Sequence, residues 1–126
     1  MPFQLNVGRE GHKCAFIPNT NKIMITGGYN DGHLDSTEVL DSEDGSVTMA
    51  SPMTSKRIWH GMEVITINGV DKLAAFGGHD GSGVLDSVEI YNAQTGRWET
   101  TDIKLRKPKH HFGFVTVKLC DVISKF

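Results

Sequence analysis

The sequence is poor in the residues that most often build metal centres, disulfide frameworks and membrane spans. Its 126 residues include two cysteines, two tryptophans, two tyrosines and four prolines. Cys14 and Cys120 alone cannot build a disulfide framework or a zinc site, so we expect Cys14, inside an apolar run, to be a buried free thiol. No apolar run has the length of a membrane span, and Met1 to Asn6 lacks the features of a secretory signal. We therefore expect a soluble, cytoplasmic protein that does not engage membranes.

Catalytic, metal-binding and nucleic-acid-binding patterns are also missing. The formal charge is −2, and no extended basic face is expected, so nucleic acid is not an expected partner. His12 and His60 hold equivalent places in the sequence, which favours a shared structural role. His110 and His111 are adjacent, and on a strand their side chains would point to opposite faces, away from any one ion. There is no phosphate-binding loop, nucleophile elbow or paired-carboxylate motif. We expect no catalytic residue, no metal and no cofactor.

What the sequence does contain is a repeat of about fifty residues. The paired segments are 23–28 and 73–78, 34–39 and 85–90, and 9–12 and 57–60, with a weaker echo at 108–111. A fixed period of this size is the signature of a repeat architecture, in which one supersecondary unit buries its faces against the next.

Each repeat contains four short apolar runs bounded by Gly, Asn, Asp or Ser, with no helical spacing, and this pattern predicts an all-β fold. The predicted strands are 13–17, 22–26, 37–40 and 46–48 in the first repeat, and 61–67, 72–76, 88–91 and 97–100 in the second. Asn68-Gly69 and the segment 94–96 predict tight hairpins, because Asn and Gly adopt the positive φ values that such turns require.

The second repeat resembles the kelch repeat. A strand ends in the doublet Gly77-Gly78, a strand containing a glutamate carries Tyr91, Trp98 follows seven residues later, and Arg57 precedes the innermost strand. The resemblance covers residues 9–117 and implies a β-propeller, in which four-stranded antiparallel blades are set radially around a channel. It also implies that these residues are structural.

The first repeat keeps the doublet, Gly27-Gly28, but has Leu40 and Val47 in place of the aromatic pair, and the third has no doublet. We divide the chain into a lead-in (1–8), kelch repeat 1 (9–56), kelch repeat 2 (57–107), the start of repeat 3 (108–117) and an atypical tail (118–126). These segments make an incomplete propeller of about two blades and part of a third, whereas closure takes roughly 4–8 blades. A fragment of a larger propeller protein, or a truncated product, is favoured over self-association.

The kelch resemblance implies a non-catalytic protein-interaction module. In such propellers the loops after the Gly-Gly strand and the segments that lead into the innermost strand gather at one mouth. The candidate partner-binding residues at these positions are Tyr29, Asn30, His33, Trp59, His79 and His110. Because tyrosine and tryptophan are common interface hot spots, the expected partner is another protein or a peptide.

Resemblance to the commonest animal kelch proteins further implies substrate recognition in an adaptor of a cullin-type ubiquitin ligase. The dimerising and cullin-binding domains would lie outside these 126 residues. Binding to actin or the cytoskeleton is the alternative within the same class. A fragment of a kelch-type sugar-acting enzyme is the alternative from another class, although Tyr29 and Tyr91 offer too few ligands for its copper centre.

Overall fold

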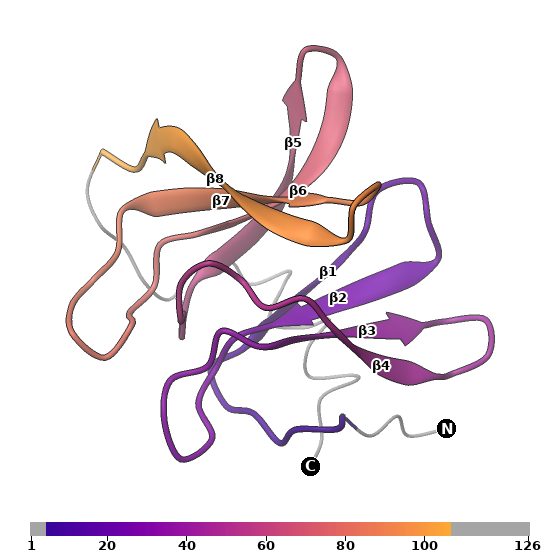
Figure 1. Ribbon diagram of the computed structural model, residues 1–126, viewed down its shortest axis with the longest axis horizontal. Helices are drawn as coiled ribbons and strands as arrows, with labels where there is room; N and C mark the ends of the chain where they lie inside the picture. The colour runs from indigo at the N-terminus through magenta and orange to yellow at the C-terminus, as the bar shows by residue number, and fades with distance from the viewer. Residues whose placement is uncertain (1–4, 107–126) are drawn as a thin grey trace.

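The computed structural model describes residues 5–106, which form two four-stranded antiparallel sheets (Figure 1). The first sheet holds β1 (Lys13–Phe16), β2 (Lys22–Thr26), β3 (Thr37–Asp41) and β4 (Val47–Ala50), in that order. The second holds β5 (Gly61–Ile67), β6 (Val70–Phe76), β7 (Ser87–Asn92) and β8 (Arg97–Lys104). The predicted all-β fold of four-stranded blades is confirmed for this part of the chain. The segments 108–117 and 118–126, with His110, lie outside the described residues.

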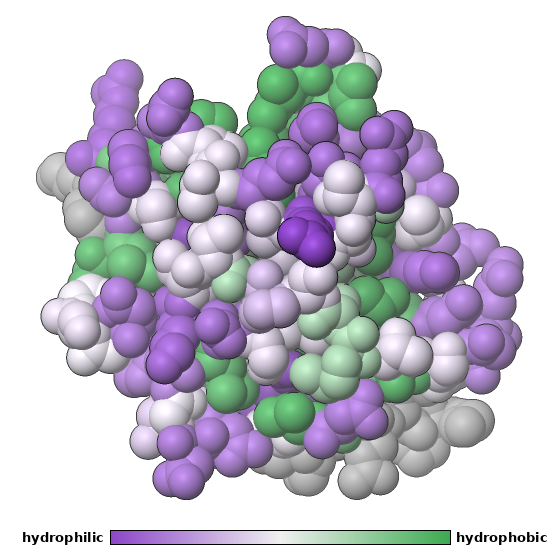
Figure 2. Space-filling view, in the orientation of Figure 1, coloured by the Kyte–Doolittle hydropathy of each residue, from purple (hydrophilic) through white to green (hydrophobic). Residues whose placement is uncertain are grey.

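The turns follow the local sequence. Asn68 and Gly69 have φ values of 51° and 78°, the two positive values that a tight hairpin of the predicted kind requires. Between β7 and β8, Asn92 accepts hydrogen bonds at its side-chain oxygen from the backbone N–H of Gln94 (2.9 Å) and Thr95 (3.2 Å). Figure 2 shows hydrophobic side chains among polar ones on the β5–β6 hairpin, which projects at the top of Figure 1.

The strand that departs most from its predicted bounds is the last one. The last strand of the second sheet, β8, continues to Lys104 rather than ending at Thr100. A register shift between Ser87 and Glu89 allows Ser87 to pair with Lys104 after Glu89 has paired with Thr100. This irregularity gives β8 two more residues than β7 over the same span, and the alternation of apolar residues does not reveal it.

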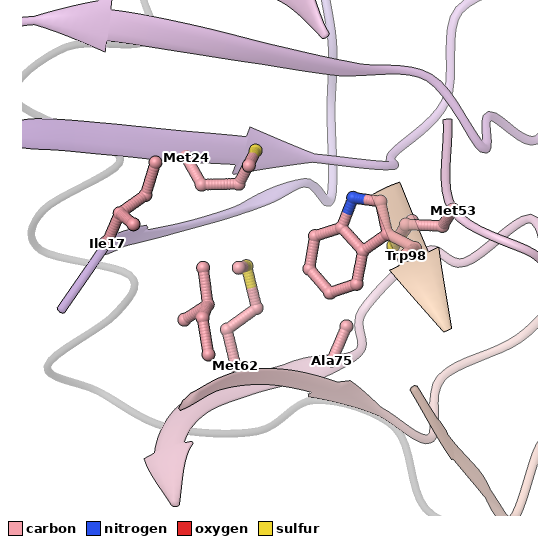
Figure 3. Close-up of a cluster of buried hydrophobic side chains, with 7 residues drawn as sticks. Ile17, Met24, Met53, Met62, Ala75 and Trp98 are labelled. Carbon is pink, nitrogen blue, oxygen red and sulfur yellow. The ribbon is translucent and has the colours of Figure 1, made fainter. Parts of the chain in front are cut away.

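A hydrophobic core lies between the two sheets (Figure 3). Because side chains alternate along a strand, Met24 of β2 faces the second sheet while Ile23 and Ile25 face away from it. The buried members of this core are Ile17, Met24, Met53, Met62, Leu73, Ala75 and Trp98. Trp98 also lies beside Tyr91, with ring centroids 5.4 Å apart.

The two sheets pack head to tail: the face that one sheet uses in this contact is not the face that the other sheet uses. Leu73, Ala75 and Trp98 of the second sheet point at the first. Their counterparts in the first sheet, fifty or fifty-one residues earlier, are Ile23, Ile25 and Val47, which belong to a separate cluster with Leu5 and Cys14. Each sheet therefore offers two different apolar faces, as stacked repeats require.

Cys14 corrects one expectation. It is fully buried in β1, but it is disulfide-bonded rather than a free thiol. Pairing of a cysteine depends on what the fold brings beside it, and the spacing of two cysteines in a sequence carries no such information.

Candidate functional site

The loops that follow the two glycine doublets lie on the same side of the molecule, at the left of Figure 1. We call this surface the loop face and define it as residues 8–12, 28–34, 56–60 and 78–85. In the first loop, Tyr29 forms a β-bridge with His33, and in the second, His79 forms the equivalent bridge with Val84. The repeat thus gives both loops the same closing bridge, although the second loop is one residue longer and carries different side chains.

Aromatic rings connect the two loops. The rings of Tyr29 and His33 meet edge to face with centroids 5.5 Å apart, and His33 lies 5.6 Å from His79 of the other loop. The β-carbon of any residue replacing Gly81 would lie 3.2 Å from Nδ1 of His33. Three of the predicted partner-binding residues therefore form one cluster across the two repeats.

The segments that lead into the innermost strands bind these loops through their backbones. Glu10 and Tyr29 exchange two hydrogen bonds of 3.1 and 2.8 Å, and Ile58 and His79 exchange two of 3.0 Å. The N–H of Gly28 also donates to the carbonyl of Arg57, at 2.7 Å, and so joins the two repeats.

A buried arginine in each repeat holds the base of its loop. Each guanidinium donates to a carboxylate on the third strand, to the carbonyl of the first glycine of the doublet and to a serine carbonyl at the far end of the loop. The two sets are Arg9 with Glu38, Gly27 and Ser36, and Arg57 with Glu89, Gly77 and Ser87, at 2.8–3.1 Å. Both ends of each loop are therefore fixed to one rigid side chain.

Each of these arginines forms a buried ion pair with a glutamate. Burial lowers the pKa of Arg57, and the carboxylate of Glu89 opposes that shift; Arg9 and Glu38 show the same balance. An arginine stays charged under such conditions, because its ordinary pKa is above 12. Glu89 also accepts a hydrogen bond from the backbone N–H of Thr54, at 2.7 Å, and so holds the segment that precedes β5.

Sequence reasoning assigned Arg57 a structural place but missed Arg9, Glu38 and Glu89 as parts of this framework. A charged residue in a short strand is usually read as exposed. The available signal was the recurrence of Arg and Glu at equivalent positions of both repeats.

Three large hydrophobic side chains are exposed on the loop face: Tyr29, Trp59 and Val84, with exposed fractions of 42%, 41% and 41%. Asn30 is exposed as well, and His33 and His79 are half-buried. Val84 was not among the predicted residues. His110, the remaining candidate, lies outside the described residues.

Trp59 has an unusual backbone. Its φ is +56°, in the left-handed region that bulky residues rarely adopt. Its N–H donates to the carbonyl of Gly11 at 2.8 Å, and a β-carbon at Gly11 would lie 2.9 Å from Nε1 of Trp59. The glycine therefore makes room for the indole ring, which lies against the first repeat and remains partly exposed.

A hollow of about 320 Å³ lies beside Tyr29, lined by Gly8, Glu10, Asn30 and Asp31 as well. A second hollow, of about 340 Å³, lies at the opposite end of the sheets, between the segments 17–19, 70–73 and 91–94. In the second hollow, the side-chain oxygen of Asn92 already accepts a hydrogen bond within the β7–β8 turn. The loop face, by contrast, combines a hollow with exposed aromatic rings.

His60 lies under the loop face and is fully buried. Its Nε2 is 2.7 Å from the hydroxyl oxygen of Thr26, which in turn donates to the sulfur of Met62 at 3.0 Å. Burial, with smaller contributions from Arg57, Lys13 and His12, holds the pKa of His60 well below 6.5.

Within residues 5–106, no three His, Cys, Asp or Glu side chains come together as metal ligands would. This part of the chain also contains no helix long and apolar enough to cross a membrane.

Comparison with known families gives a match within the second sheet. Residues 71–101 match the family model of the kelch motif. This match covers β6, β7 and the first half of β8. No curated protein matches the chain.

Proposed function

The chain carries a kelch repeat, and from this premise we propose that it recognises a partner protein through the loop face. Kelch propellers generally bind other proteins and are typically non-catalytic. Loops on a rigid scaffold are also where binding residues concentrate. The proposal adds to this general role a specific surface, centred on Tyr29 and Trp59.

The observation that carries the proposal is the placement of Trp59. A left-handed backbone costs of order 1–3 kcal/mol at a non-glycine residue, and the indole held by it remains 41% exposed. Tryptophan and tyrosine are enriched at interface hot spots, where a large, rigid ring fills a pocket of the partner.

The buried arginines support the same surface. Arg9 and Arg57 fix both ends of the two loops, so Tyr29, His33 and His79 are held in place before a partner arrives. Preorganisation lowers the entropic cost of binding.

A photo-crosslinking amino acid tests the position of the interface. Placed at Asn30, which is exposed on the loop face, it should capture a partner from cell extract. Placed at Gln94, which is exposed in the β7–β8 turn at the opposite end, it should capture none of that partner. Equal capture at both positions, or unchanged capture at Asn30 when Trp59→Ala is added, would reject the loop face as the binding surface.

The narrower proposal is that the protein serves as the substrate-recognition part of a cullin-type ubiquitin ligase adaptor. It is supported by the kelch resemblance alone. Immunoprecipitation of the protein from its own cells should then recover a cullin. Recovery of actin without a cullin would favour the cytoskeletal alternative.

A further inference from the structure

We infer that the partner segment bound by the loop face is basic, with a Lys or Arg side chain seated in the hollow formed by Glu10, Tyr29, Asn30 and Asp31. This inference rests on the proposed function and adds the chemistry of the partner.

The charges of the loop face are unequal. Its ionisable carboxylates are Glu10, Asp31 and Asp80, and Lys56 is the one exposed lysine or arginine in the four segments that define it. The backbone N–H groups of Ser82 and Gly83 lower the pKa of Asp80, which keeps it ionised near neutral pH. Within the described residues, the surface offered to a partner is therefore predominantly negative.

The two arginines in these segments offset little of this charge, although Arg57 interacts electrostatically with Asp80. Arg9 and Arg57 are 0% and 1% exposed, and each is paired with a buried glutamate. Their hydrogen bonds point down into the sheet and to loop carbonyls, not toward a partner. An acidic partner would meet Glu10 and Asp31 without a compensating guanidinium.

The hollow beside Tyr29 combines two features that recognise a cation. Within the described residues, neither Glu10 nor Asp31 forms a side-chain hydrogen bond or ion pair, so both carboxylates remain available. The exposed face of Tyr29 lines the same hollow, and an aromatic ring attracts an ammonium or guanidinium group within about 6 Å of its centroid. A guanidinium can also bind a carboxylate through two parallel hydrogen bonds.

The backbone places these groups together in a defined way. Glu10 and Tyr29 are joined by two hydrogen bonds, so the carboxylate and the ring start from adjacent strands of one small bridge. Asp31 follows two residues later with φ of +57°. Asp and Asn tolerate this left-handed conformation better than most residues, so Asp31→Asn removes the charge with little change to the backbone.

Fluorescence anisotropy with two labelled peptides, (Gly-Arg)₆ and (Gly-Glu)₆, tests the inference on the whole chain. The first peptide should bind and the second should not, and the binding should weaken as salt is added. The paired substitution Glu10→Gln with Asp31→Asn should weaken (Gly-Arg)₆ by about fivefold or more, the effect of losing two exposed charge contacts.

The matched control is Glu63→Gln with Asp102→Asn, which removes one Glu and one Asp that are exposed on β5 and β8. Equal weakening by the control pair, tighter binding of (Gly-Glu)₆, or no binding of (Gly-Arg)₆ would overturn the inference. If Tyr29→Ala weakens binding of the captured partner while the carboxylate pair does not, the inference fails and the proposed function stands. If neither change matters to that partner, both fail.

Discussion

Arg57 and Glu89 illustrate how single residues decide the shape of the loop face. They are charged, yet both are almost completely buried, and each is bound by the other and by backbone groups from distant parts of the chain. Replacing both members of a buried ion pair with apolar residues often costs little stability. Removing one member is costly, because it leaves a buried charge without its partner. The pair therefore matters most for the geometry that it imposes.

The substitution Arg57→Met tests this role. It should lower the free energy of unfolding by about 3–5 kcal/mol, because Glu89 is left buried and unpaired. Denaturant titration followed by circular dichroism measures the change. The neighbouring exposed substitution Lys56→Met should alter stability by less than about 0.5 kcal/mol.

Adding Glu89→Leu to Arg57→Met should recover part of the loss, since the double variant buries no lone charge. If Arg57→Met alone proves as stable as the parent chain, the buried pair does not hold the loop.

His60 should make the stability of the described sheets sensitive to mild acid. Its pKa in the folded state lies well below the ordinary 6.5, mainly because of burial, so the unfolded chain takes up the proton first as pH falls. Stability is therefore complete above pH ~6.5 and decreases below it, by about 1.4 kcal/mol per pH unit until the lowered pKa is reached.

Urea unfolding at several pH values between 7.5 and 5 checks this expectation. The His60→Gln variant should lose that part of the slope, whereas His33→Gln, on the half-buried loop histidine, should retain it. Parallel slopes for the parent chain and His60→Gln would show that His60 is not the acid-sensitive group.

At the scale of elements, the second glycine of each doublet lets the loop pass close to the innermost strand. A β-carbon at Gly78 would lie 2.7 Å from both the carbonyl oxygen of Ile58 and the β-carbon of His60. Gly28 meets the carbonyl of Glu10 in the same way, also at 2.7 Å. These are backbone contacts, which cannot move aside as a flexible side chain can.

The substitution Gly78→Ala should therefore be strongly destabilising, because it combines this clash with a φ of +86°. We expect a loss of about 2 kcal/mol or more, visible as a lower melting temperature in calorimetry. Gly83→Ala provides the control, since nothing lies within 4 Å of the added β-carbon. Equal melting temperatures for the two variants would contradict this account of the doublet.

The strands were largely predictable, whereas the interactions between residues far apart in the sequence were not. Alternation of apolar residues and the Asn68-Gly69 turn place β5 and β6 within two residues of their observed ends. The extension of β8 to Lys104 depends on a bulge opposite Ser87, which leaves no mark on the pattern. Burial of Glu38 depends on Arg9, twenty-nine residues away, so a sequence window cannot reveal it.

The sequence predicted which residues occupy the loops, but not how their side chains meet on one surface. The repeat placed Tyr29 and His79 at equivalent loop positions, but the ring contact that joins His33 to His79 requires both repeats to be folded together. Val84 escaped notice because exposure at the end of a loop follows from tertiary structure, not from residue type.

At the scale of the whole molecule, the two sheets form a head-to-tail pair, and the loop face that we propose as the binding surface extends over both. The core around Met24 and Trp98 holds the sheets together, and the hydrogen bonds of Gly28 with Arg57 and of Trp59 with Gly11 join their loops. Two repeats of the same backbone thus present different side chains side by side. We therefore expect a partner to contact both repeats rather than either repeat alone.

The affinity of the captured partner for single-residue variants, measured by isothermal titration calorimetry, tests the central claim most directly. Trp59→Ala and Tyr29→Ala should each weaken binding by about 2 kcal/mol or more, the usual size of a hot spot, at a temperature where both variants remain folded. Thr100→Ala, exposed on the outer strand β8, should leave affinity intact. If Thr100→Ala is as harmful as the two aromatic substitutions, or if neither aromatic residue matters, partner recognition does not occur at the loop face.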